Sequence, residues 1–279
     1  MSLALISSSR CFGGKQHTFL YESDVCKTVM RFAMFLPKES KRSNVPILWF
    51  LCGLGCSEGN AVAKLGAQQF AAKHGIALIM PDNSPREACI KKKIDDEFIG
   101  VGASFYVDAT KKPWSKNYQM YSFIVDELQI LIQKSFPIDT DKQGIFGHSM
   151  GGHGALTIGL KHPELFKSIS AFAPICAPTK CSLGQNAFNA YLGDDEETWQ
   201  EYDATALILN GKKSDEILID QGSQDEFLED QLNPELFAVA CEMNQQPLNL
   251  RLQHGYDHGY FFVASFMEDH ITFHANRLQ

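Results

Sequence analysis

The sequence predicts an α/β fold with a mostly parallel central sheet, antiparallel strands at its N-terminal edge and helices on both faces. Residues 45–51 form a continuous apolar run, typical of a strand that helices cover on both faces. A glycine-rich turn, a helical pattern over residues 61–74 and a buried strand over residues 76–80 follow. This order indicates parallel strands joined by right-handed crossovers. Later, the glycine-rich sequence GHSMGGHG, residues 147–154, lies between another apolar run and another helical run.

The remaining elements are predicted in chain order from their apolar spacing. Residues 17–24 and 28–37 alternate apolar and polar side chains, and Pro37 ends the second run, which indicates antiparallel edge strands. Further elements are recognised by apolar residues on one helix face or by short apolar runs. Helices are expected over residues 119–136, 151–162, 233–244 and 259–276, and strands over residues 143–147, 168–174, 216–220 and 248–253.

Two long segments interrupt this alternation. Residues 83–117 contain clusters of both charges, and residues 175–214 are rich in Gly, Asn and Asp and are expected to be irregular. Excursions of this length inside a compact fold tend to be functional, so both are expected to border the active site. A chain of 279 residues suits a single α/β domain over residues 1–279.

The composition excludes several classes of function. A net charge of -8 argues against a nucleic-acid or anionic-membrane surface, because either would need a basic face. The sequence shows no signal peptide and no apolar stretch of bilayer length, so the chain is expected in the cytoplasm, with its eight cysteines as thiols. Their spacing lacks the paired pattern of zinc ligands, and neither a metal nor a cofactor is expected.

The GHSMGGHG sequence has the GxSxG pattern of a nucleophile elbow. Ser149 lies between Gly147 and Gly151, and a sharp turn from strand to helix needs neighbours without side chains. The helix that follows would offer backbone N–H groups and the positive end of its dipole to the oxyanion of a tetrahedral intermediate. Ser149 is therefore the predicted nucleophile of an acyl-transfer reaction.

A serine hydroxyl needs a histidine to take its proton and usually a carboxylate to orient that histidine. In hydrolases with this elbow the chain order is serine, acid, histidine. The predicted strand over residues 216–220 leads to three candidate acids, Asp220, Asp225 and Glu226. Asp225 is preferred, because it lies in the loop beyond the strand and has room to approach the site.

Four later histidines are candidates for the base. His270 and His274 fall within the predicted terminal helix, whereas His254 and His258 follow the last predicted strand. His258 is preferred, because it lies in a loop between Asp257 and Gly259.

The oxyanion hole is expected to use the N–H of Met150, directly after the nucleophile, and the N–H of Leu54 in the turn after residues 45–51. Gly53 and Gly55 flank Leu54, so the backbone of this turn can approach a substrate closely.

The same turn supports a rival class. GLGCSEG is close to the GxGxxG pattern of dinucleotide-binding proteins, and Asp82 ends the next strand where a ribose-binding acid would lie. The last glycine is displaced by one position and edge strands precede the unit, so a nicotinamide oxidoreductase is the weaker prediction. A third class, a binding protein with the hydrolase fold, would be expected to lack a triad residue, and none is missing.

Motifs over nearly the whole chain carry a family resemblance. They are CFGG (11–14), PDNSPR (81–86), FYVDAT (105–110), PW (113–114), GHSMGGHGAL (147–156), SAFAPIC (170–176), YLG (191–193), YDAT (202–205), ILIDQG (217–222) and YDH (256–258). Together they resemble the S-formylglutathione hydrolase family, also called esterase D.

This resemblance implies an α/β-hydrolase that cleaves the S-formylglutathione thioester to glutathione and formate, the last stage of glutathione-dependent formaldehyde detoxification. It implies that no metal is needed, that small-acyl esters are also cleaved, and that the chain forms a homodimer. The matching motifs give Ser149 as nucleophile, Asp225 as acid and His258 as base. A general short-chain carboxylesterase or acyltransferase of the same fold is the alternative prediction.

Some positions depart from the family pattern. CGLGCSEGN (52–60) stands where the family more often has SGLTCTEQN, and Ile99 lies in a stretch that is usually richer in glycine. Leu183 stands where a tryptophan is common, and it is predicted to let acyl groups larger than formyl enter the pocket. Cys56 lies either near the bound glutathione sulfur or in the core as a small hydrophobic residue.

The groups that bind the glutathione carboxylates are not identified by sequence. The lysines at 91–93 are a candidate, although a solvated surface is the favoured interpretation.

Overall fold

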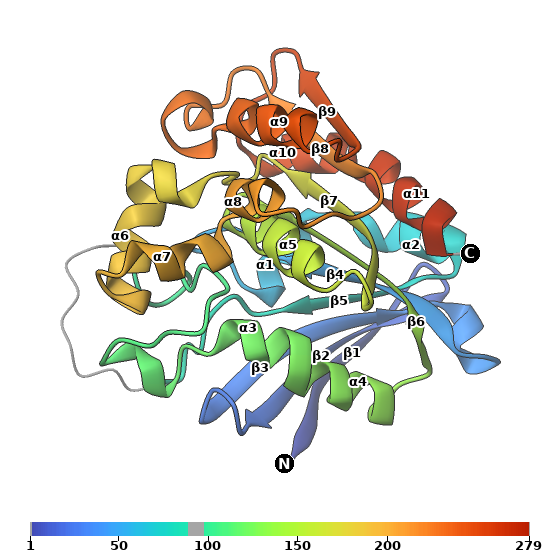
Figure 1. Ribbon diagram of the computed structural model, residues 1–279. Coiled ribbons are helices and arrows are strands. Elements are labelled where there is room, and N and C mark those ends of the chain that lie inside the picture. The colour runs from blue at the N-terminus through green and yellow to red at the C-terminus, as the bar shows by residue number, and fades with distance from the viewer. Residues whose placement is uncertain (1, 89–97, 279) are drawn as a thin grey trace.

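The central element of the structure is one twisted sheet (Figure 1). The computed structural model describes residues 2–88 and 98–278. Within these residues the sheet has nine strands in the order β1-β2-β3-β5-β4-β6-β7-β8-β9. They are β1 (Leu3–Cys11), β2 (Gly14–Ser23), β3 (Thr28–Leu36), β4 (Val45–Leu51), β5 (Ala77–Pro81), β6 (Ile138–His148), β7 (Phe166–Phe172), β8 (Ile217–Gly222) and β9 (Leu248–Gln253).

The pairing of the strands changes once across the sheet, from antiparallel to parallel at β5. The neighbours β1, β2, β3 and β5 pair antiparallel, whereas β5, β4, β6, β7, β8 and β9 all run parallel. The predicted fold class, a mostly parallel sheet with antiparallel N-terminal edge strands, is therefore confirmed. All parallel strands place their carboxyl ends at the same rim, which is where ligands bind in such sheets.

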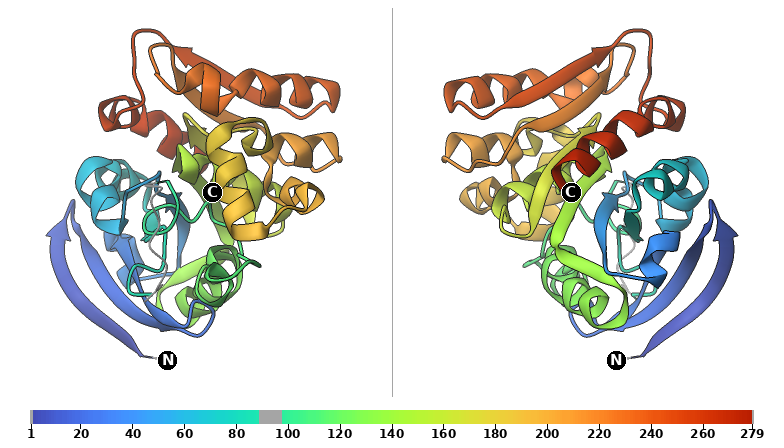
Figure 2. Two further views of the ribbon diagram at one scale, coloured as in Figure 1. Left: turned by 90° about the vertical axis from the view of Figure 1, so that its left-hand side faces the viewer. Right: turned by 90° about the vertical axis from the view of Figure 1, so that its right-hand side faces the viewer.

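Helices cover both faces of the sheet (Figures 1 and 2). They are α1 (Glu58–Lys64), α2 (Ala67–His74), α3 (Met120–Ser122), α4 (Leu128–Ser135), α5 (Met150–Lys161), α6 (Ser182–Leu192), α7 (Glu196–Trp199), α8 (Ala204–Leu209), α9 (Pro234–Met243), α10 (Tyr260–Ser265) and α11 (Met267–Leu278). An added Cβ at Gly144 would meet His274 of α11, whereas Gly159 of α5 faces Ile145. Because these neighbouring β6 residues point to opposite faces, α11 and α5 lie on opposite sides. Among the described helices, none combines the length and apolar character that a membrane span requires.

The edge strand β1 was not predicted. Its side chains are mostly exposed along the strand, in contrast to those of β2. It therefore lacks the alternation of buried and exposed residues by which a half-buried strand is recognised. A tight turn with positive φ at Phe12 and Gly13 joins it to β2, and Figure 2 shows it at the outer edge of the sheet.

Three predicted helices are interrupted in the structure. The helix expected over residues 61–74 is two helices, α1 and α2, and Gly66 has a left-handed conformation at the start of the second. The helix expected over residues 119–136 consists of α3, a π-helical segment and α4. The terminal helix is divided into α10 and α11 around Phe266. Apolar spacing continues across each interruption, so periodicity alone does not detect it.

The prediction of an irregular segment over residues 175–214 was wrong. This segment contains α6, α7 and α8. Its polar residues end and begin short helices: Asp195 accepts a hydrogen bond from the N–H of Glu197, and Asp203 accepts one from the N–H of Ala206. Gly193, with φ of 94°, ends α6. Asp and Gly therefore mark helix ends here instead of a long loop.

The other excursion, residues 83–117, is mostly irregular in its described parts. These parts are residues 83–88 and 98–117, with one 3-10 turn at Trp114–Lys116. The lysines at 91–93, named as a candidate for binding carboxylates, lie outside the described residues.

Candidate active site

Ser149 lies on a sharp turn between β6 and α5. Its backbone has φ of 58° and ψ of −120°, a region that non-glycine residues rarely adopt. A Cβ added at Gly147 would overlap the backbone oxygen of Gly151, and one added at Gly151 would overlap that of Leu51. Both glycines are therefore required sterically, which is the reason for expecting them around an elbow serine.

Ser149 opens into a cavity of about 270 Å³ at the carboxyl ends of the parallel strands. The loops after five strands line this cavity, which is called the Ser149 cavity below. They contribute Leu54 after β4, Ser149 after β6, Ile175 after β7, Phe227 after β8 and His258 after β9. Segments that are far apart in the sequence thus meet at one rim, as expected for this type of sheet.

His258 is paired with Asp225. The Nδ1 atom of His258 lies 2.7 Å from Oδ2 of Asp225. The same carboxylate accepts hydrogen bonds from Nε2 of Gln221 at 3.0 Å and from the N–H of Phe227 at 2.9 Å. Burial alone would raise the pKa of Asp225, but its hydrogen bond to His258 and the charge of that imidazole, with the other donors, lower the pKa below its usual value. Asp225 is therefore an ionised partner for His258.

The other candidate acid at this strand, Asp220, is engaged elsewhere. Its carboxylate accepts hydrogen bonds from Nε of Arg251 at 2.7 Å and from Nε2 of Gln253 at 2.8 Å. Its Oδ2 lies 3.0 Å from Nε2 of His270. Asp220 is thus held by groups away from His258, so of these two candidate acids Asp225 is the one that contacts His258.

His270 and His274, the candidate histidines of the terminal helix, are fully buried away from the Ser149 cavity. The Nδ1 and Nε2 atoms of His274 lie 2.6 and 2.8 Å from the hydroxyls of Ser168 and Ser170. His270 lies 2.8 Å from the Ser170 hydroxyl and stacks on Phe172, with 3.7 Å between ring centroids. These imidazoles satisfy the polar groups between α11 and the sheet, so they belong to the core.

The turn that carries Leu54 packs directly against Ser149. A Cβ added at Gly53 would lie 3.2 Å from the Cβ of Ser149. Met150 begins α5, and its N–H and that of Leu54 donate no hydrogen bond within the described residues. Both N–H groups are therefore free to donate, as the predicted oxyanion hole requires.

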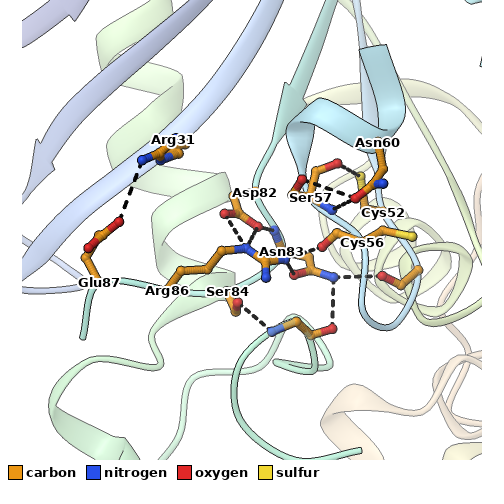
Figure 3. A network of polar contacts seen from close by, with 12 residues as sticks. Arg31, Cys52, Cys56, Ser57, Asn60, Asp82, Asn83, Ser84, Arg86 and Glu87 are labelled. Carbon is orange, nitrogen blue, oxygen red and sulfur yellow. Dashed lines mark hydrogen bonds and ion pairs between the residues drawn. The ribbon is translucent and has the colours of Figure 1, made fainter. Parts of the chain in front are cut away.

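A buried polar network holds this turn in place (Figure 3). The side-chain amide of Asn83 donates to the carbonyl oxygens of Gly53 and Gly102 at 2.7 and 2.9 Å. Arg86 binds Asp82 through Nε, with oxygens at 2.8 and 3.0 Å, and its Nη2 donates to the carbonyl oxygen of Cys56. The carboxylate of Asp82, which the oxidoreductase prediction assigned to a ribose, thus binds Arg86 instead.

Sequence reasoning missed the roles of Asn83 and Arg86. Both fall in the PDNSPR motif, which contributed to the family resemblance but carried no chemical role. The partners of Asn83 are backbone carbonyls of residues 30 and 19 positions away. Nothing in the local pattern indicates such partners, so only the fold identifies these residues as supports of the Leu54 turn.

His148 is a further site residue that the sequence did not indicate. It is buried beside Ser149, and its Nε2 lies 3.0 Å from the carbonyl oxygen of His258. The centroids of the two imidazole rings are 4.7 Å apart. Burial, followed by the charge of His258, lowers the pKa of His148 to about 3, so it is neutral and donates through Nε2. In the sequence, the only indication that His148 lies in the site is its position in the elbow motif, directly before Ser149.

Leu183 and Cys56 both line the Ser149 cavity. Leu183 is half-buried at the start of α6, where its N–H donates to Oε1 of Gln231 at 3.1 Å. The Cys56 thiol accepts a hydrogen bond from the Tyr260 hydroxyl at 3.4 Å. Cys56 is thus at the cavity wall and half-buried, and its closeness to a bound sulfur stays a prediction.

The fold and this site define the class of the protein as an α/β hydrolase of the esterase type. A family model described as "Putative esterase" matches residues 23–273. The chain is 50% identical to S-formylglutathione hydrolase of Mus musculus over 281 residues, covering 100% of this chain and 99% of the relative. It is 48% identical to that of Paracoccus denitrificans, covering 98% and 97% of the two chains.

A solved structure gives the same result. The S-formylglutathione hydrolase of Agrobacterium tumefaciens is 44% identical and superimposes with a TM-score of 0.97, covering 99% of each chain. The chain therefore belongs to the S-formylglutathione hydrolase family. It is a hydrolase, and the oxidoreductase and non-catalytic predictions are set aside.

Proposed function

We propose that this chain hydrolyses the thioester of S-formylglutathione to glutathione and formate, with Ser149 as nucleophile, His258 as base and Asp225 as orienting acid. The observation that carries the proposal is the 2.7 Å contact between His258 and the ionised Asp225, at the rim of the cavity that Ser149 also lines. Relatives named S-formylglutathione hydrolase over their whole length support the choice of substrate.

In the first half of the reaction, Nε2 of His258 takes the proton of the Ser149 hydroxyl as its oxygen attacks the formyl carbon. The hydrogen bond to Asp225 keeps the proton of His258 on Nδ1 and stabilises the imidazolium that forms. The N–H groups of Leu54 and Met150 hold the oxyanion. When the intermediate collapses, the carbon–sulfur bond breaks, the thiolate takes the proton from His258, and glutathione leaves the formyl-enzyme.

In the second half, water attacks the formyl carbon while His258 takes one of its protons. The second tetrahedral intermediate uses the same two N–H groups. Its collapse breaks the bond to Ser149, the serine oxygen recovers its proton from His258, and formic acid is released and gives up its proton to water as formate. The reaction would complete glutathione-dependent formaldehyde detoxification, and we place it in the cytoplasm. The seven described cysteines are free thiols, which supports a reducing compartment.

The test compares kcat/KM for S-formylglutathione and for a simple aryl acetate, in the wild type and in Ser149→Ala. We expect the thioester to be preferred and the variant to lose both activities by several orders of magnitude. A clear preference for the aryl ester would instead favour a general short-chain carboxylesterase. The apolar side chains of Leu54, Leu183 and Phe227 in the Ser149 cavity keep this second function under consideration.

A further inference from the structure

A second cavity, of about 380 Å³, adjoins the Ser149 cavity. Two segments of the chain line both cavities. Phe98 lines the Ser149 cavity and the next residue, Ile99, lines the second. Likewise, α6 contributes Leu183 to the Ser149 cavity and Asn186 and Asn189 to the second. Because residues three apart share one face of a helix, the two cavities follow one another along α6.

The lining of the second cavity is cationic and polar. Lys111 and Lys112 line it together with Asn186 and Asn189 of α6. The ammonium of Lys111 donates to the carbonyl oxygen of Asn189 at 3.2 Å and lies 3.5 Å from the exposed carboxylate of Asp194. Lys112 is exposed and has no ion pair with any described residue. An anion entering this cavity would therefore find the Lys112 charge unneutralised by the described part of the chain.

The overall charge of the protein makes this local charge significant. The net charge is -8, so an anionic substrate is repelled by the molecule as a whole and needs cations near its binding site. The groups closest to Ser149 do not supply them, because the Ser149 cavity is lined largely by apolar side chains such as Leu183 and Leu232. Glutathione carries a carboxylate at each end and its sulfur in the middle residue, so its charged ends must lie outside that cavity.

The spacing of the two cavities suits a molecule of this size. From Leu183 to Asn189 the axis of α6 advances by about 9 Å, at about 1.5 Å per residue. Because the sulfur lies in the middle residue, the relevant length is that of the arm from the acyl carbon through the cysteine to the carboxylate of the γ-glutamyl end, about nine bonds or roughly 10 Å when extended. A glutathione thioester with its acyl carbon at Ser149 therefore has the length to bring one terminal carboxylate to the second cavity.

We propose that this second cavity binds a carboxylate of the glutathione part of the substrate, with Lys112 as the main cation and Lys111 beside it. The inference rests on the proposed function and names how the same site recognises its thioester. Because the contact is made equally before and during the reaction, it lowers KM and leaves kcat unchanged.

The test uses Lys112→Gln, the double variant Lys111→Gln/Lys112→Gln, and Lys112→Arg, which retains the charge. Lys116→Gln is the matched control, because Lys116 is an exposed lysine of the same loop that does not line the cavity. Two quantities are measured: the KM for S-formylglutathione, and the inhibition constant of S-methylglutathione against hydrolysis of an aryl acetate. Melting temperatures verify that each variant is folded.

We expect both constants to rise about threefold to tenfold in the double variant, the range for two exposed ion pairs. Lys112→Arg and Lys116→Gln should stay within about twofold of the wild type, and aryl acetate hydrolysis should be unchanged in all variants. If the wild type hydrolyses S-formylglutathione but the double variant keeps both constants, the second cavity is not the carboxylate site and the proposed function stands.

The remaining outcomes concern the proposed function. In one outcome the wild type does not hydrolyse S-formylglutathione, but S-methylglutathione inhibits it and this inhibition weakens in the double variant. That result would support the second cavity as the carboxylate site and overturn the proposed reaction. Neither hydrolysis nor inhibition in the wild type would overturn both.

Discussion

The Nε2 atom of His148 lies 3.0 Å from the carbonyl oxygen of His258, so the residue before Ser149 holds the backbone of the proposed base. Ser149 and His258, which exchange a proton in the proposed mechanism, are thereby both tied to the end of β6. The pKa of the His148 imidazole is lowered to about 3, so this ring stays neutral beside the imidazolium that the proposed mechanism forms on His258.

This contact predicts that His148 is a positioning residue. His148→Phe removes the donor, and we expect kcat for an aryl acetate to fall about tenfold or more, because a small displacement of a catalytic group is costly. KM should change little. His148→Gln retains an N–H donor and should recover part of the lost kcat. Equal kcat values for the Phe and Gln variants, with both folded, would show that the hydrogen bond has no role.

The pairing of Asp225 with His258 predicts a large effect on rate with little effect on the fold. In Asp225→Asn the neutral amide no longer stabilises the imidazolium or fixes its tautomer, so kcat should fall by about 10³- to 10⁴-fold. Glu226→Gln, at the neighbouring acid, is the control and should retain nearly full activity. Steady-state kinetics of both variants decide the assignment, and comparable losses in the two would contradict it.

Leu183 predicts a broader acyl range than a tryptophan at this position would give. The wild type should hydrolyse aryl acetate, propionate and butyrate with a shallower decline in kcat/KM than Leu183→Trp, because the larger ring would fill part of the Ser149 cavity. The comparison uses one aryl leaving group throughout. A decline that is equally steep or steeper in the wild type would remove Leu183 from the list of residues that set acyl size.

The buried imidazoles predict a loss of stability in mild acid. Burial lowers the pKa of each from its ordinary value of 6.5, to about 3 for His148 and about 4 for His153, and also lowers those of His270 and His274. Below pH 6.5 the unfolded chain therefore binds more protons than the folded chain. The free energy of unfolding is therefore unaffected by the protonation of these groups above pH 6.5. It decreases progressively as the pH falls from 6.5 toward the pKa values of the folded protein.

Urea unfolding between pH 8 and pH 4 measures this dependence. We expect the free energy of unfolding to decrease below about pH 6.5. In His274→Gln, where the amide can still reach the hydroxyls of Ser168 and Ser170, the decrease should be smaller. His254→Gln, at an exposed histidine, is the control and should follow the wild type. The same slope in all three proteins would contradict a contribution from His274.

The central strands and the order of the site residues could be predicted from sequence because their signals are local. Strands such as β4 are buried on both faces and appear as continuous apolar runs, and the elbow needs glycines at fixed positions around Ser149. The expected homodimer and the extent of a single domain over residues 1–279 stay predictions, and light scattering of the purified protein would test the first.

The features that the sequence does not predict either depend on partners far away in the chain or belong to a strand with few buried side chains. The role of Asn83 is set by two carbonyls in other loops, and that of His148 by the backbone of a residue 110 positions away. The helices of residues 175–214 were missed because Asp195 and Asp203 cap helices, while the same residue types also occur in loops.

The exposed edge strand β1 affects the tendency of this protein to aggregate in a crowded solution. In the described sheet it pairs with β2 alone, so its outer side presents N–H and C=O groups. Its register is interrupted by an irregularity between Leu5 and Ser7. A strand with such an interruption is a poor template for a strand of another molecule, so this edge resists edge-to-edge pairing between molecules.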